Sequence, residues 1–294
     1  MTKIDILIAI VINAIWGTAY AFSKYAMKVF PPVLLFSVRF IICGVSALPF
    51  NLPKKRIDKK QLFYLFLFSL ITSVTFFTSS IGASKLDTAV ANVVDKMDIP
   101  ITIILGVSFL GEKLRLKTVL GIILCFLAVY ITSGNVEVEN LKYIWLMFAG
   151  CFFTSVASIF SKRIKVNNKI KVCWSSIVVG FVLLILSKLM GEEINHGMLD
   201  FKVVLSLIFL AMVCGYLCYV GLYYLLEKYN TSMVMPYKFL SPIVSVIAGL
   251  VILGEAITKE KVFSIVLIII GVGISQYSFK RQIVVNTRIP QKVN

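Results

Sequence analysis

Charged residues are scarce in this chain. Only 15% of its 294 residues are Asp, Glu, Lys or Arg, whereas 59% are hydrophobic and the mean hydropathy is +0.93. A soluble core cannot bury this much apolar surface, but a lipid bilayer can accommodate it. The composition therefore predicts an integral membrane protein.

The apolar runs also lack the period-two alternation of an outer-membrane barrel strand. They continue for about twenty residues, the length that a membrane-spanning helix needs. We therefore predict an all-α integral membrane protein with ten transmembrane helices around a central cavity. The predicted spans are 5–22, 33–50, 62–80, 87–110, 116–133, 143–161, 173–190, 203–226, 231–253 and 262–279.

The chain has a single histidine and no nucleotide-binding P-loop sequence. The single histidine, His196, follows Glu192 and Glu193 in a predicted loop, with too few nitrogen or sulfur ligands for a closed metal site. We predict a solvated loop there, no metal and no cofactor. No G-x-x-x-x-G-K-[ST] sequence occurs, so any transport must be driven by a gradient or by exchange. Six cysteines lie in or beside the spans, as small buried hydrophobes would: Cys43, Cys125, Cys151, Cys173, Cys214 and Cys218.

Acidic residues are fewer than basic ones, 14 against 30, which gives a net charge of +16. The basic residues lie in short loops rather than on a soluble face, so no nucleic-acid partner is expected. With the N-terminus in the cytoplasm, 19 Lys and Arg fall on the cytoplasmic side and 8 on the other. The positive-inside rule then predicts a multi-pass protein of the bacterial inner membrane with both termini cytoplasmic.

One motif occurs twice. Leu110-Gly111-Glu112 recurs as Leu253-Gly254-Glu255, 143 residues later, and a polar stretch at 134–140 separates the two copies. We infer two five-span repeats, residues 1–141 and 142–294. Because five is odd, the second repeat must be inverted in the membrane, as in many secondary transporters.

Together these features resemble the drug/metabolite transporter superfamily and, within it, the EamA family of bacterial carriers. The resemblance covers nearly the whole chain. It rests on Trp16-Gly17, Arg39, and the doubled Pro100…Gly111-Glu112 and Pro242…Gly254-Glu255. It implies a central cavity lined by the first, third, fourth, sixth, eighth and ninth spans, with the fifth and tenth at the periphery. Trp16 and Arg39 have no counterpart in the second repeat, so symmetric roles are not implied.

The fourth predicted span carries Asp95, Lys96 and Asp98 near its middle. A charge at the bilayer centre costs roughly 2.5–3.5 kcal/mol on insertion scales, so these side chains must face protein, water or one another. On a continuous helix, Asp95 lies at the centre of a polar face that also holds Asn92. The ninth span has a second polar stripe with Lys238, Tyr237 and Ser241.

Facing each other, the two stripes would bring together two lysines and two aspartates, whose formal charges cancel. Such a site suits a ligand with both signs of charge. The structural alternative is buried ion pairs that fix helix register, but such pairs contribute little net stability compared with apolar packing. We favour a substrate site, with Asp95 and Asp98 as candidates for a coupling proton.

Aromatic residues supply candidate walls for the cavity. Tyr216, Tyr219 and Tyr223 recur at helical spacing in the eighth span, and Phe76 occupies the position equivalent to Tyr219 in the first repeat. A tyrosine hydroxyl in lipid needs a partner, which favours the cavity over packing. Trp16 is an equally good candidate for the opposite wall and for an interfacial or packing role.

Three further charged residues remain. Arg39 fits a functional role and a snorkelling or capping role equally well. Glu112 and Glu255 follow glycines at helix ends, and we predict a structural role in which each accepts hydrogen bonds from the N-terminus of the next helix.

The leading hypothesis is a secondary carrier that moves a small amphoteric metabolite, an amino acid or a derivative, by alternating access. Its expected partners are this substrate, the lipid bilayer, and a proton or counter-substrate. A nucleotide-like or cationic metabolite exchanger is the second hypothesis, because aromatic walls can stack a base or enclose a cation. A polytopic membrane enzyme is less well supported, because no catalytic cluster lies at a membrane surface. A channel would need a continuous polar lining that most spans lack. The oligomeric state is not predicted.

Overall fold

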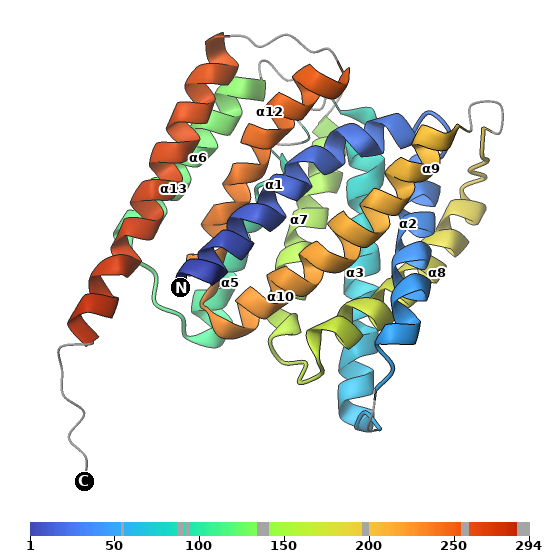
Figure 1. Ribbon diagram of the computed structural model, residues 1–294, viewed down its shortest axis with the longest axis horizontal. Coiled ribbons are helices and arrows are strands. Elements are labelled where there is room, and N and C mark those ends of the chain that lie inside the picture. The colour runs from blue at the N-terminus through green and yellow to red at the C-terminus, as the bar shows by residue number, and fades with distance from the viewer. Residues whose placement is uncertain are drawn as a thin grey trace.

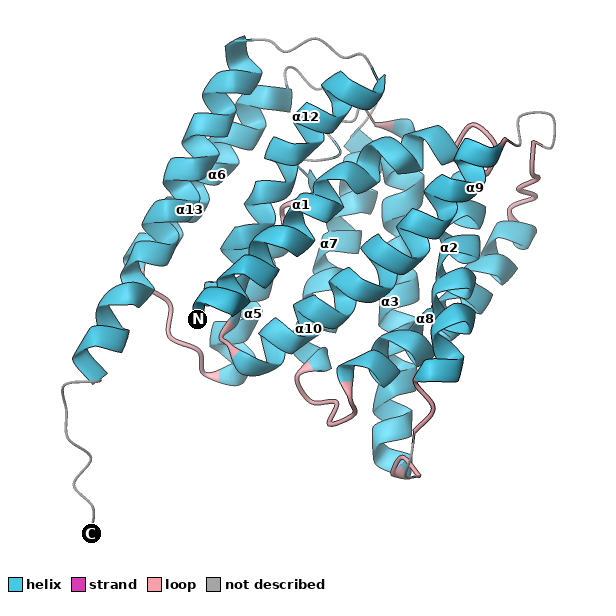
Figure 2. Ribbon diagram, in the orientation of Figure 1, coloured by secondary structure: helices cyan, strands magenta, loops and turns pink. Residues whose placement is uncertain are grey.

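The computed structural model describes residues 1–53, 56–86, 91, 94–133, 141–195, 200–253 and 259–286. The described part of the chain consists of helices and loops and contains no strand (Figure 2). Asn92, His196 and Glu255, which entered the sequence predictions, lie outside these ranges.

The first half contains α1 (Lys3–Ala26), α2 (Pro32–Ala47) with the 3₁₀ turn η1 (Leu48–Phe50), α3 (Lys59–Lys85), α5 (Asp98–Leu110) and α6 (Leu116–Ser133). The second half contains α7 (Leu141–Ser161), α8 (Asn168–Leu189), α9 (Phe201–Ile208), the π-helix η4 (Phe209–Leu217), α10 (Cys218–Lys228), α11 (Thr231–Val234), the 3₁₀ helix η5 (Met235–Phe239), α12 (Leu240–Leu253) and α13 (Lys259–Asn286). Figure 1 shows these helices packed as one bundle.

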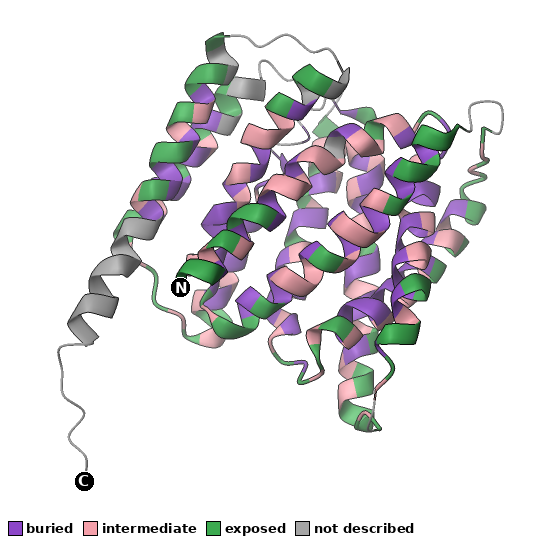
Figure 3. Cartoon of the chain, viewed as in Figure 1, coloured by how far each residue is buried: buried purple, intermediate pink, exposed green. Residues whose placement is uncertain are grey.

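Seven helices of the described chain are long and apolar enough to cross a membrane. Three shorter apolar helices, Asp98–Leu110, Leu116–Ala128 and Val262–Ser275, lie where the sequence predicts the fourth, fifth and tenth spans. Exposed residues occur along many of the helices (Figure 3). They include large apolar residues such as Leu7, Phe109 and Ile185, as a lipid-facing surface requires. The prediction of an all-helical membrane protein is therefore confirmed.

Small residues allow helices of the two halves to pack closely. A side chain at Gly44 of α2 would collide with Ile177 of α8, and one at Gly180 of α8 would collide with Ile41 of α2. Gly121 of α6 and Gly271 of α13 lie against each other's backbone in the same way. The paired helices α6 and α13 form one edge of the bundle (Figure 1), which agrees with the peripheral position expected for the fifth and tenth spans.

Two spans are interrupted near their middle. Lys96 and Met97 form a turn just before α5, and Lys238 lies in η5 between α11 and α12. A proline follows each lysine by four residues, and its ring clashes with the lysine carbonyl while its nitrogen has no proton to donate to that oxygen. Pro100 and Pro242 are these two residues.

Other groups satisfy the carbonyls at the breaks. Ile99 N–H donates to Lys96 O at 3.1 Å, and the Ser241 hydroxyl donates to Lys238 O at 2.9 Å. The Cys151 thiol of α7 donates to Val94 O at 3.1 Å. The prediction of a continuous helix through the charged residues was therefore wrong: the prolines break both helices at that level.

Candidate functional site

A cavity of about 450 Å³ lies in the middle of the bundle. Side chains from α1, α3, α5, α7, α10 and α12 line it, which agrees with the spans that the resemblance implied. The second span also contributes, through Phe36 and Arg39 of α2. None of the described residues of α6 or α13 lines the cavity.

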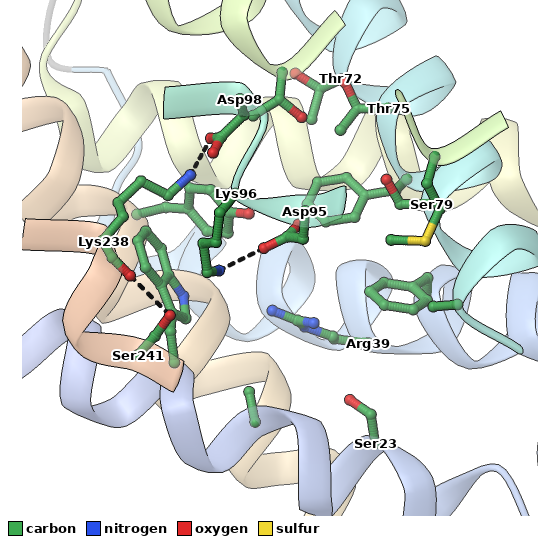
Figure 4. Close-up of a pocket in the computed structure, with 18 of the residues that line it drawn as sticks. Ser23, Arg39, Thr72, Thr75, Ser79, Asp95, Lys96, Asp98, Lys238 and Ser241 are labelled. Carbon is green, nitrogen blue, oxygen red and sulfur yellow. Dashed lines mark hydrogen bonds and ion pairs between the residues drawn. The ribbon is translucent and has the colours of Figure 1, made fainter. Parts of the chain in front are cut away.

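Two ion pairs lie at the level of the helix breaks (Figure 4). Lys238 Nζ pairs with Asp98 Oδ2 across the two halves of the chain, and Lys96 Nζ pairs with Asp95 Oδ2 at 2.6 Å. The side chain of Asp98 is 3% exposed, whereas that of Asp95 is 44% exposed. Asp98 is therefore engaged with Lys238, and Asp95 keeps part of its carboxylate open to the cavity.

Aromatic rings form one wall of this cavity. Trp16 and Tyr219 lie with ring centroids 5.2 Å apart, and Tyr219 also contacts Phe76 at 6.3 Å and Tyr223 at 5.9 Å. The Trp16 indole N–H donates to Cys214 O at 2.9 Å. Cys214 belongs to the π-helix η4, where wider turns reposition the backbone carbonyls, so the irregular helix fixes the orientation of Trp16.

Most of the predicted site residues lie at the cavity. Its lining includes Trp16, Phe76, Asp95, Lys96, Asp98, Tyr219, Lys238 and Ser241.

Tyr216 and Tyr237 do not line the cavity. Tyr216 packs at the edge of the apolar core, and Tyr237 is 6% exposed within that core. Both predictions assumed a regular α-helix. Tyr216 lies in the π-helix η4 and Tyr237 in the 3₁₀ helix η5, so their directions differ from those of a regular helix. Asn92 lies outside the described residues.

Other lining residues were missed. Thr72, Thr75 and Ser79 of α3 line the cavity at positions i, i+3 and i+7, a polar stripe that the sequence displays. Arg39, which the sequence left undecided, is buried and lies at the cavity (Figure 4).

The end of the bundle near the N-terminus is closed by polar contacts around Asp5. The side chain of Asp5 is 2% exposed, and its carboxylate accepts hydrogen bonds from Lys228 Nζ at 2.8 Å and Tyr224 Oη at 3.1 Å. The hydroxyls of Thr2 and Tyr229 also donate to it. This cluster joins the start of α1 to the end of α10.

A second cluster at the same end is centred on Glu112. Its carboxylate accepts from both the backbone N–H and the hydroxyl of Thr231, each at 2.7 Å, and from Lys162 Nζ at 2.7 Å. Lys162 also donates to Tyr229 O at 3.1 Å, which connects the two clusters. Gly106 leaves room for this contact, because a Cβ there would collide with the Thr231 hydroxyl.

The prediction for Glu112 was wrong in one respect. It accepts from the N-terminus of α11 in the other half, not from the helix that follows it. The cause is Gly111, whose positive φ of 65° ends α5 and turns Glu112 back, with its N–H donating to Gly106 O at 3.2 Å.

Comparison with known proteins agrees with this architecture. The EamA-like transporter family model matches residues 3–134 and again 141–276. An uncharacterized transporter from Archaeoglobus fulgidus is 27% identical over 88% of this chain and 94% of its own length. A probable amino-acid metabolite efflux pump from Salmonella typhimurium is 27% identical over 95% and 97%, and one with the same description from Escherichia coli is 24% identical over 95% and 97%.

A solved crystal structure, described only as that of a protein, matches with a TM-score of 0.79 at 16% identity, over 96% of this chain and 99% of that one. At this identity the match shows the fold alone. A helical membrane bundle with a charged central cavity between two interrupted helices has the architecture of a transporter. The chain belongs to the EamA-like transporter family.

Proposed function

We propose that this protein is a secondary carrier of the cytoplasmic membrane, and that it moves a small amphoteric metabolite, an amino acid or a derivative, by alternating access. The observation that carries the proposal is the pair of interrupted helices facing one cavity, with Asp98 of one paired to Lys238 of the other. Interrupted helices at mid-membrane supply polar groups to a substrate without exposing them to lipid.

The arrangement of helices supports two inverted five-span repeats and a total of ten spans. In two such repeats α1 corresponds to α7 and α5 corresponds to α12. The contact of α1 with α12 should then have a counterpart between α7 and α5, and both contacts are present. The contacts of α2 with α8 and of α6 with α13 map onto themselves. The family model matches two stretches, 3–134 and 141–276, and this supports the proposed division into the units 1–141 and 142–294.

The cavity is open toward one end of the bundle and closed at the other, as expected for one state of an alternating-access cycle. The cavity extends to Ser23 and the exposed Lys24 near the C-terminal end of α1, and to Ser84 near that of α3. The Asp5 and Glu112 clusters close the opposite end. If the N-terminus is cytoplasmic, as the positive-inside rule favours, the described state faces outward.

The charges of the cavity support an amphoteric substrate. A ligand with both an ammonium and a carboxylate group can replace internal partners on both sides, which a singly charged ligand cannot. The relatives described as probable amino-acid metabolite efflux pumps point to the same substrate class. Displacing Lys96 from Asp95 would leave a carboxylate able to take up a coupling proton.

The aromatic wall of Trp16, Tyr219 and Phe76 supports the second candidate, a nucleotide-like or cationic substrate. The two candidates are separated by counterflow into proteoliposomes that contain the purified protein. The vesicles are loaded with unlabelled amino acids, nucleotides or organic cations, and uptake of the matching labelled compound is measured. Accumulation of at least one labelled amino acid supports the proposal. Accumulation of nucleotides or organic cations alone would contradict it.

A further inference from the structure

Arg39 is a buried cation that lines this cavity. Its side chain is 6% exposed and lies among the lining residues, near the middle of α2. Its Nε is buried without a hydrogen-bond partner, and no ion pair or hydrogen bond joins its guanidinium to any residue that the structure describes. We propose that Arg39 binds the carboxylate of the transported metabolite, an inference that rests on the proposed function.

The described charged groups inside the cavity do not balance without a ligand. Asp95 and Asp98 are paired with Lys96 and Lys238, so these four residues sum to zero. Arg39 adds one positive charge in a region where an uncompensated charge is costly. An incoming carboxylate supplies the missing partner, and a guanidinium fork matches the two oxygens of a carboxylate.

Aromatic rings hold the guanidinium of Arg39 in place. Its guanidinium carbon lies 5.4 Å from the ring centroid of Phe36 and 5.7 Å from that of Phe40. Phe40 and Phe36 each contact Phe76, at 4.6 and 5.6 Å, so the rings form a fixed support. Stacking positions a guanidinium without using its N–H donors, which remain available for a ligand.

The two halves of the chain differ at the position of Arg39. Gly44 contacts Ile177 and Gly180 contacts Ile41, so α2 and α8 correspond at an offset of 136 residues. The residue of α8 equivalent to Arg39 is therefore Ser175, and the second half offers no matching cation. The open carboxylate, Asp95, also belongs to the first half. Figure 4 shows Arg39 and Asp95 extending into the same part of the cavity. A zwitterion bound there would place its carboxylate at α2 and its ammonium group at Asp95.

This orientation deepens the proposed function in one specific respect. It requires a free carboxylate on the substrate, so amides and esters of the same amino acids should bind poorly. Losing a hydrogen-bonded charge pair of this kind typically lowers affinity by about 10- to 100-fold. A cationic or neutral metabolite would gain nothing from Arg39.

The test compares each amino acid that the wild type takes up with its carboxamide, as competitors in the same proteoliposome counterflow assay. Wild type should favour the acid over the amide by about 10-fold or more. Arg39→Gln should lose affinity for the acid, so that the ratio falls toward one. Arg39→Lys keeps the charge but loses the fork, and should give an intermediate ratio. Lys188→Gln makes the same charge change at an exposed site on α8 and should leave the ratio unchanged.

Equal affinity of wild type for acid and amide, or an unchanged ratio in Arg39→Gln, would overturn the assignment of Arg39 while leaving an amino-acid carrier intact. If wild type takes up no amino acid, the proposed function fails and this inference fails with it. Size-exclusion profiles check that each variant is folded. If Arg39→Gln does not fold, an unchanged ratio in Arg39→Lys overturns the proposal.

Discussion

Asp98 at the start of α5 and Lys238 in η5 form an ion pair that joins the two halves of the chain, although 140 residues separate them in the sequence. Both lie where a helix is interrupted. Under the proposed alternating-access mechanism the two halves move relative to each other, and this pair would lie where that movement has to be accommodated.

The pair gives a prediction about stability. Asp98→Asn leaves Lys238 buried without a partner, which typically costs roughly 3–5 kcal/mol, whereas replacing both partners with neutral groups costs much less. In detergent, Asp98→Asn should therefore lower the apparent Tm more than the double variant Asp98→Asn/Lys238→Met does. If the double variant is less stable than either single variant, the loss of stability in Asp98→Asn does not come from leaving Lys238 without its partner.

The Glu112 cluster gives a prediction about access. Glu112→Gln removes the charge that holds Lys162 and weakens the bond to Thr231, which should shift the protein toward the state open at that end. A cysteine at Thr154, on a background without native cysteines, should then react about ten times faster with an impermeant reagent added from the cytoplasmic side.

Glu227→Gln is the matched control for this experiment. Glu227 lies exposed at the same end and accepts a hydrogen bond from Asn168 at 2.8 Å. The Glu227→Gln variant should leave the labelling rate of the cysteine at position 154 unchanged. If Glu112→Gln also leaves it unchanged, the cluster is not part of the closed gate.

Membrane topology gives a third prediction. Single cysteines at Lys59 and Lys169 should react only with reagent on the cytoplasmic side, and one at Asn195 only with reagent outside, because α3 and α8 start where short basic loops lie. If the cysteines at positions 169 and 195 react with reagent on the same side of the membrane, both the inverted repeats and the number of spans are contradicted.

Proton coupling gives a fourth prediction. If Asp95 or Asp98 carries the proton, an imposed pH gradient should drive net substrate movement, and an Asn substitution at the carrier residue should remove that response. Exchange of substrate for substrate should persist in the variant, because it needs only the loaded carrier to reorient. A wild type that ignores the gradient but exchanges fully would be an antiporter of metabolites.

The helical class, the approximate spans and most cavity residues could be predicted from sequence, because membrane insertion leaves long apolar runs and makes intramembrane charges conspicuous. The helix breaks were harder to see. Pro242 indicates a break in the ninth span, but not the 3₁₀ geometry of η5 that turns Tyr237 into the core. The sequence of the π-helix η4 contains no proline, so nothing in it indicates that Tyr216 points away from the cavity.

The sequence predicted that the two charged spans face each other, but not the contacts at the end of the bundle near the N-terminus. Nothing near Glu112 in the sequence indicates Thr231 or Lys162 as its partners. The role of Arg39 could not be decided from sequence for the same reason. Whether its guanidinium has a partner depends on the residues that surround it in the folded protein.

Counterflow in proteoliposomes with Lys238→Ala and Asp95→Ala tests the proposed site most directly, provided that both variants elute as folded protein. If the paired charges of the cavity bind the substrate, both variants should lose counterflow of the amino acid that the wild type accumulates. Lys96→Ala should show a milder loss. Wild-type counterflow in both Lys238→Ala and Asp95→Ala would mean that the substrate binds elsewhere and that the ion pairs only hold the helices together.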